Sequence, residues 1–224
     1  MNYARTSAIV AASVLTLAAA QVPAQAGGAT CRGRLATIVG TAGADTLRGT
    51  PGRDVIAGRG GDDTIFGGGR LDVLCGDAGA DRIGGGAGRD LINGSNGADR
   101  LGGGGGFDRV RGGAGPDQIG GGRLGDRVSG GAGVDVLRGG PGNDRVSGGA
   151  QRDRLFGNGG NDGVFGSAGF DILVGGSGAD RLFGGTENDT LDGVDGAPDD
   201  VINGGPGADT CTGDPGDERI DCNP

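Results

Sequence analysis

The sequence lacks histidine, tryptophan and lysine altogether, and aromatic residues make up only 3% of its 224 residues. Aromatic side chains supply much of the buried area of an ordinary globular core. Nucleophilic catalysis needs a serine or cysteine beside a base such as histidine or lysine. These absences argue against a conventional globular domain and against an enzyme, and we expect no catalytic residue.

Positive charge is also scarce, since 29 acidic residues outnumber 20 basic ones and give a formal net charge of −9. Phosphate binding requires an excess of positive charge, so this balance disfavours nucleic acid as a partner. The same excess of negative charge favours cations as binding partners. Every basic residue is arginine, which together with abundant glycine and alanine is typical of a GC-rich bacterial genome.

Long apolar runs are missing except near the start, where residues 1–26 have the features of a signal peptide. Arg5 precedes an apolar run over residues 8–20, and a small-x-small cleavage site, AQA, occupies residues 24–26. The run is shorter than the roughly 20 residues that span a bilayer, which argues against an uncleaved anchor. We expect Sec-type export from a bacterial cell, cleavage before Gly27 and a secreted, extracellular product without a membrane span.

Four cysteines in an exported chain favour disulfides over thiol chemistry. Three pairings of Cys31, Cys75, Cys211 and Cys222 are open. The segment from Cys211 to Cys222 is short and turn-rich, which favours local closure and leaves Cys31 to pair with Cys75. A zinc site is the alternative, but the absence of histidine and of any CxxC motif disfavours it.

Glycine, with 59 residues, recurs with a strict period. A glycine-rich chain without a period is typically disordered. Here glycine opens seventeen consecutive nonamers from Gly40 to Gly184, and the eighth place of each is Leu, Ile or Val. The sixth place is always aspartate: Asp45, Asp54, Asp63, Asp72, Asp81, Asp90, Asp99, Asp108, Asp117, Asp126, Asp135, Asp144, Asp153, Asp162, Asp171, Asp180 and Asp189. After a two-residue slip, Asp200 and Asp209 resume the pattern.

Each nonamer reads as a glycine-rich turn of six residues followed by a strand of three, with the middle strand residue pointing inward. Two nonamers complete one revolution, so repeat n stacks on repeat n+2 at about 4.8 Å. The sequence therefore predicts an all-β, two-sided β-solenoid of about ten revolutions, with two facing ladders of Leu, Ile and Val. The expected parts are a signal peptide (1–26), an N-terminal cap strand (27–39), the repeats (40–212) and a C-terminal cap with a disulfide (213–224).

The stacking also places the aspartates in two columns, with Asp117 one rung from Asp99 and Asp135. Carboxylates at this spacing repel one another, and no matched basic column lies beside them. Calcium takes six to eight oxygen ligands from carboxylates and carbonyls, whereas magnesium prefers a rigid octahedron and retains its waters. Aspartates that only form turns are the alternative, but asparagine would then serve equally well, and it never occupies the sixth place.

The pattern G-G-x-G-x-D-x-U-x, which covers residues 40–221, resembles the RTX (repeats-in-toxin), or haemolysin-type, calcium-binding nonapeptide repeat. The resemblance implies a right-handed parallel β-roll in which Ca²⁺ lies between stacked turns. The sixth-place aspartates, including Asp200 and Asp209, would be ligands, and carbonyls of the first to fourth places would complete each shell. Because no catalytic or toxic domain accompanies the repeats, no toxin, protease or lipase activity is carried over.

Four repeats depart from the pattern at the fourth place. Arg70, Leu124, Gln151 and Glu187 replace glycine there, and a positive φ at that place would strain them. We expect weak or empty sites at these turns, and roughly ten to fifteen calcium ions in all.

Arg109, Arg127 and Arg145 share the seventh place of alternate repeats, so they should form a ladder. Phe165 and Phe183 should likewise stack one rung apart. The ladder is either a solvated edge paired with nearby acids or an anion-binding patch.

From the repeats we expect a secreted protein that binds several calcium ions and folds on binding them. The alternative is an extracellular adhesin or polysaccharide-binding module that uses the exposed Arg and Phe stripes to bind matrix or a cell surface.

Overall fold

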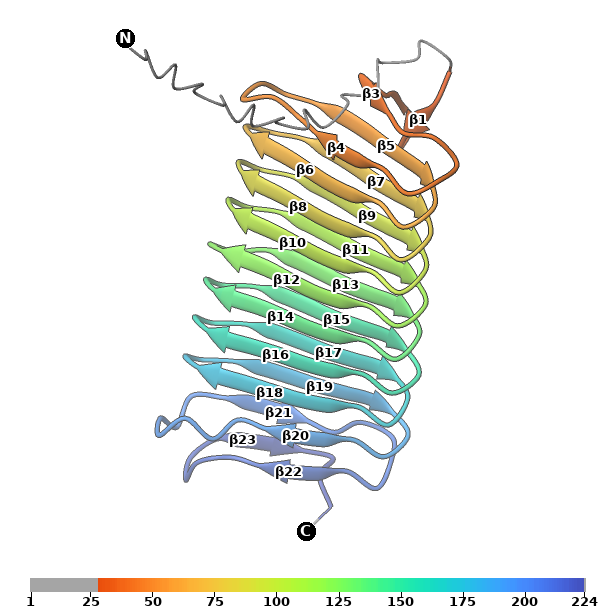
Figure 1. Cartoon of the computed structure of the whole chain (residues 1–224). Coiled ribbons are helices and arrows are strands. Elements are labelled where there is room, and N and C mark those ends of the chain that lie inside the picture. The colour runs from red at the N-terminus through yellow and green to blue at the C-terminus, as the bar shows by residue number, and fades with distance from the viewer. Residues whose placement is uncertain (1–27, 224) are drawn as a thin grey trace, which may run out of the picture.

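The computed structural model describes residues 28–223. The expected signal peptide lies outside these residues. The described chain is an all-β parallel solenoid, a rod of stacked coils that runs from the orange N-terminal end to the blue C-terminal end in Figure 1. Within residues 28–223 there is no helix long and apolar enough to cross a membrane.

Two parallel sheets form the two sides of the rod. The ten-stranded sheet contains β4 (Thr46–Arg48), β6 (Thr64–Gly69), β8 (Arg82–Ala87), β10 (Arg100–Gly105), β12 (Gln118–Arg123), β14 (Val136–Pro141), β16 (Arg154–Gly159), β18 (Ile172–Ser177), β20 (Thr190–Asp192) and β22 (Thr210–Thr212). The eleven-stranded sheet contains β3 (Ile38–Val39), β5 (Val55–Gly60), β7 (Val73–Ala78), β9 (Leu91–Asn96), β11 (Arg109–Ala114), β13 (Arg127–Ala132), β15 (Arg145–Ala150), β17 (Gly163–Ala168), β19 (Arg181–Thr186), β21 (Val201–Asn203) and β23 (Glu218–Ile220).

Every strand in these sheets pairs with the strand two places further along the chain, so consecutive strands lie on opposite sides of the rod. Val110 of β11, for example, pairs with Val128 of β13, eighteen residues later. This register confirms two nonamers per revolution.

The strands are longer than the sequence predicted. Those in the middle of the rod have six residues, such as β12 (Gln118–Arg123), and they run from the seventh place through the third place of the next nonamer. The expectation of a six-residue turn was therefore wrong, and only places four to six form the turn. Equal repeat lengths hold the glycine-rich backbone in register with its neighbours, so it pairs as well.

The eighth-place side chains form the core. They make one continuous cluster from Leu47 to Ile202, and none of them is more than 5% exposed. Each rung contacts mainly the rungs above and below it, so the core grows with each added repeat rather than converging on a centre. This confirms the two facing aliphatic ladders.

The N-terminal end is covered by an antiparallel hairpin, β1 (Thr30–Cys31) and β2 (Arg34–Leu35), which lies outside the eleven-stranded sheet. The Cys31–Cys75 disulfide ties the hairpin to β7. Cys31, Ala57, Val73 and Cys75 form a small second core beneath it.

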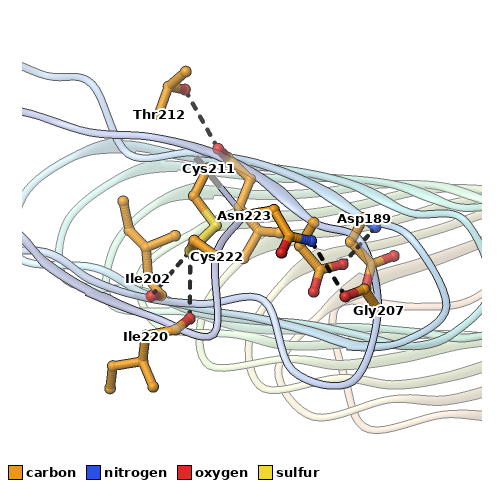
Figure 2. The surroundings of a disulfide bond; sticks show 10 residues. Asp189, Ile202, Gly207, Cys211, Thr212, Ile220, Cys222 and Asn223 are labelled. Carbon is orange, nitrogen blue, oxygen red and sulfur yellow. Dashed lines mark hydrogen bonds between the residues drawn. A yellow bond between two sulfur atoms is a disulfide. The ribbon is translucent and has the colours of Figure 1, made fainter.

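A second disulfide, Cys211–Cys222, closes the C-terminal end, and both disulfides match the pairing that the short C-terminal loop favoured. Figure 2 shows Cys211 and Cys222 beside Ile202 and Ile220. The Asn223 side chain there donates a hydrogen bond of 3.3 Å to the carbonyl of Gly207. The disulfide thus fixes the last strand segments against the open end of the core.

Candidate metal centres

The sixth-place aspartates are buried. Eighteen of them, from Asp54 to Asp209, are at most 6% exposed, and Asp45 in the first repeat is half-buried. A buried carboxylate is strongly destabilising unless it is paired, hydrogen-bonded or bound to a metal. These columns therefore require compensation along the whole rod.

In the columns from Asp63 to Asp209, one oxygen of each carboxylate accepts a hydrogen bond from the neighbouring rung. The backbone N–H of Asp99 donates to Oδ1 of Asp117 at 2.9 Å, and that of Asp117 donates to Oδ1 of Asp135 at 2.8 Å. The same bond recurs in both columns, as in the 2.7 Å bond from Asp108 to Asp126. Each aspartate thus lies one rung from the next, as the period predicted, and bridges the gap between two rungs.

The other oxygen is buried and has no hydrogen-bond partner among the described residues in seventeen repeats. An acceptor left unsatisfied in this way costs about 1–3 kcal/mol, and more when it is charged. These Oδ2 atoms belong to Asp63, Asp72, Asp81, Asp90, Asp99, Asp108, Asp117, Asp126, Asp135, Asp144, Asp153, Asp162, Asp171, Asp180, Asp189, Asp200 and Asp209. Such a set calls for a ligand that binds oxygen.

Asp45 and Asp54 are exceptions that the sequence did not single out. Their Oδ2 atoms accept hydrogen bonds from the backbone N–H and the hydroxyl of a threonine at the second place, Thr41 and Thr50 respectively. Threonine in place of the usual glycine was the available signal. The first two repeats therefore satisfy their carboxylates internally.

The orphaned oxygens point toward the glycine at the first place. A Cβ on Gly85 would lie 2.5 Å from Oδ2 of Asp90 and 2.5 Å from the carbonyl oxygen of Gly103 in the next rung. A carboxylate oxygen and a carbonyl oxygen thus approach the same space from neighbouring rungs, and only glycine leaves that space open. Oxygen-only donors of this kind suit a hard cation such as Ca²⁺.

Side chains alone do not complete such a site. Within residues 28–223, no three His, Cys, Asp or Glu side chains gather at one point. A cation between rungs would therefore draw the rest of its shell from main-chain carbonyls and water, which Ca²⁺ accepts readily. The donor set present fits calcium bound between backbone turns, not a compact carboxylate cluster.

Burial also changes the acidity of the columns. It raises the pKa of Asp117 to about 7, and the charges of Asp99 and Asp135 add to the shift, while the hydrogen bond from the Asp99 amide opposes it. Burial likewise raises the pKa of Asp126 and of Asp153 to about 7. Without a cation, these aspartates therefore ionise less readily than aspartates in water.

From the third to the seventeenth repeat the fourth place has a positive φ, so the residues that replace glycine there are strained as expected. Gly115 has φ +117°, and Leu124 and Gln151 are held at 73° and 78°. Left-handed backbone costs a residue with a side chain about 1–2 kcal/mol. The turn containing Leu124 nevertheless buries Asp126 like its neighbours, so the strain does not displace the carboxylate.

The second place of many repeats also has a positive φ, which the sequence analysis did not predict. Five residues other than glycine have a positive φ there, and the repeated glycine at this place was the signal that could have identified them. They are Arg59, Asp77, Ser95, Asn158 and Ser167.

The Arg and Phe candidates lie apart from the aspartate columns. Arg109, Arg127 and Arg145 are exposed and occupy equivalent positions on adjacent strands of the eleven-stranded sheet. Phe165 and Phe183 stack with ring centroids 5.1 Å apart, but both side chains are half-buried. The structure therefore places the arginine ladder on the outer surface of this sheet.

Comparison with known proteins agrees with the site. A family model described as the RTX calcium-binding nonapeptide repeat matches the chain over most of its length, and a search of curated proteins finds no significant match. The matched segments are residues 39–74, 76–110, 102–123, 120–155, 129–164, 165–198 and 194–217.

Proposed function

The chain belongs to the family of RTX calcium-binding nonapeptide repeat proteins, and we propose that it is a secreted calcium-binding β-roll that folds on binding its ions. The buried, unpartnered Oδ2 atoms of the aspartate columns carry this proposal, because they form an oxygen-rich row between the rungs. Bound calcium would neutralise the columns and hold successive turns together.

Seventeen aspartates are the proposed ligands, from Asp63 to Asp209. Each would contribute Oδ2, and main-chain carbonyls near the first-place glycines would contribute further oxygens. Asp45 and Asp54 are not needed as Oδ2 ligands, since threonines already satisfy them. We propose roughly ten to fifteen ions per chain, with the turns containing Arg70, Leu124, Gln151 and Glu187 binding most weakly.

Coupling of folding to calcium follows from the energetics of the columns. Without cations, the fold must either hold rows of buried, mutually repelling charges or take up protons, as the raised aspartate pKa values indicate. The unfolded chain leaves the same carboxylates in water. Ligands that bind only the folded state stabilise it by mass action, so each filled site favours the roll.

If the column carboxylates bind calcium, they are not available for acid–base catalysis. Each carboxylate buried in the columns either ligates a cation or is bonded to threonine, and a metal-bound carboxylate does not act as a tuned acid or base. We propose no enzymatic activity. The signal-like features of residues 1–26 support export, which would bring the chain to calcium outside the cell.

Calcium stoichiometry tests this function. Equilibrium dialysis of the chain from Gly27 onward should show roughly ten or more bound Ca²⁺ per molecule, with magnesium failing to compete at equal concentration. Only one or two bound ions, or equal competition by magnesium, would overturn the proposal.

A further inference from the structure

The outer face of the eleven-stranded sheet carries a groove that the calcium sites do not explain. It has a volume of about 250 Å³ and lies over β11, β13 and β15. Five arginines line it, accompanied by Ser129 and Ser147 and by no acidic residue. The arginines are Arg32, Arg109, Arg111, Arg127 and Arg145, all with exposed side chains. We call this feature the arginine groove.

Three of these arginines form an unbalanced row of charge. Arg109 pairs with Arg127 and Arg127 with Arg145 in the register of adjacent parallel strands. Like charges in neighbouring strand positions destabilise a sheet, and strands of this kind are about 4.8 Å apart. The groove lining offers no carboxylate to pair with them, so no ion pair within the groove offsets this repulsion.

Arg32 reaches the groove from a different part of the chain. It occupies the turn between β1 and β2 with φ 51°, followed by Gly33 with φ 76°. Two residues with positive φ favour Asn-Gly in such a hairpin turn, and arginine is strained there. The Cys31–Cys75 disulfide holds this turn over the sheet. The turn conformation itself does not favour arginine. An arginine at this strained position, beside four others, therefore suggests a role in binding a ligand.

At the far end of the groove, the Arg145 side chain packs on an aromatic stack. The guanidinium carbon of Arg145 lies 3.9 Å from the centroid of the Phe165 ring, which in turn stacks on Phe183. Gly163, the residue paired with Arg145 on the next strand, leaves room for this ring. The stack therefore orients the last guanidinium of the row before any ligand arrives.

The shape and the lining of the arginine groove favour one class of negatively charged polymer over the others. The groove lining has no aromatic face on which nucleic-acid bases could stack. An acidic peptide would find no free strand edge, because β11, β13 and β15 are each paired on both sides. The serine hydroxyls beside the guanidinium groups suit a partner that is rich in hydroxyl groups as well as anionic.

We infer that the arginine groove binds a linear polysaccharide bearing repeated carboxylate or sulfate groups, aligned with the rod axis. The guanidinium groups of Arg109, Arg127 and Arg145 bind successive anionic groups, Arg111 and Arg32 bind the chain at one end, and Ser129 and Ser147 donate to sugar oxygens. This site requires the folded roll but is separate from the calcium sites.

The test compares two triple variants of the calcium-loaded protein, each first shown by circular dichroism to be folded. Arg109→Ser/Arg127→Ser/Arg145→Ser removes the row. The matched control, Arg82→Ser/Arg100→Ser/Arg154→Ser, removes three exposed seventh-place arginines from the other sheet. Calorimetric titration with polygalacturonate, which carries a carboxylate on every sugar, and with dextran sulfate and neutral dextran separates carboxylate from sulfate recognition and both from uncharged sugar.

We expect the groove variant to lose roughly tenfold or more in affinity for polygalacturonate or dextran sulfate, and the control variant to lose less than about twofold. Arg32→Asn should weaken binding several-fold while leaving the fold intact, because asparagine suits the turn. Equal losses in both triple variants, equal affinity for single-stranded DNA, or no binding by the folded wild type would overturn the inference. A wild-type chain that folds equally well with and without calcium would instead contradict the proposed function.

Discussion

The backbone N–H of Asp117 donates a hydrogen bond of 2.8 Å to Oδ1 of Asp135, one rung further along the rod. This bond fixes the Asp135 carboxylate between two rungs and leaves its Oδ2 buried without a partner. The same hydrogen bond recurs along both columns of aspartates. In each case it positions the free Oδ2 atom, so that these atoms form a row of candidate cation ligands. Folding and ion binding thus depend on the same side chains.

Low pH should partly substitute for calcium in stabilising the fold. The pKa of Asp117 is about 7 in the folded chain against 3.8 for an unperturbed aspartate, so the folded state binds protons more tightly than the unfolded state. This contribution is fully present below about pH 4 and is lost as the pH rises through about 7. In calcium-free buffer, circular dichroism should show more β-structure near pH 5 than near pH 8. A calcium-free fold that strengthens with rising pH would contradict this.

Asp117→Asn should have opposite effects with and without calcium. Asparagine keeps the Oδ1 acceptor for the Asp99 amide but removes the charged ligand oxygen. With calcium, we expect the loss of one or two bound ions and a lower melting temperature. Without calcium, the variant should be at least as stable as the wild type, because one buried charge is gone.

The matched control is Asp62→Asn. Asp62 is an exposed fifth-place residue whose Oδ1 accepts a bond from the Ala80 amide, which asparagine also accepts. It should leave ion number and melting temperature unchanged. If Asp117→Asn behaves like this control in calcium titration and thermal unfolding, the aspartates are turn formers only.

Replacing a fourth-place glycine should destabilise the roll more than replacing a ninth-place glycine. Gly115 has φ +117°, and a Cβ there would collide with the carbonyl of Gly97. Gly102 has ordinary backbone geometry and open space around a Cβ. Gly115→Ala should destabilise the calcium-loaded roll by about 1–3 kcal/mol, and Gly102→Ala should change it by less than about 1 kcal/mol. Urea unfolding measures both, and equal effects would refute the assignment.

Leu124→Gly should strengthen a weak turn. Leu124 is held at φ 73° in a place that glycine fills in most repeats. Removing this strain lowers the free energy of the turn that carries Asp126, so calcium binding there should tighten. A calcium titration should show either one more bound ion or a lower midpoint than the wild type. An unchanged titration would mean that the fourth-place departures do not weaken the sites.

The sequence predicted the solenoid and its aspartate columns because both depend on the period alone. A repeat of constant length fixes the register, and the register fixes which residues stack, such as Asp99, Asp117 and Asp135. The strand lengths could not be predicted in the same way. Glycine-rich backbone favours turns by propensity, and only pairing with adjacent rungs, as between Gly104 and Gly122, makes it strand.

The N-terminal hairpin also escaped prediction. Its position outside the sheet depends on which outward-facing residues it covers, and these include Val73 and Cys75. No period links residues 28–36 to that surface. The placement of Arg32 beside Arg109 follows from this packing, so the arginine groove could not be recognised from the ladder alone.

Calcium titration of the chain from Gly27 onward, followed by far-ultraviolet circular dichroism at neutral pH, tests the central claim most directly. If buried aspartate columns need cations, the calcium-free chain should show little β-structure and should gain it cooperatively as calcium is added, while magnesium should not substitute. Full β-structure at neutral pH in excess chelator would contradict the account.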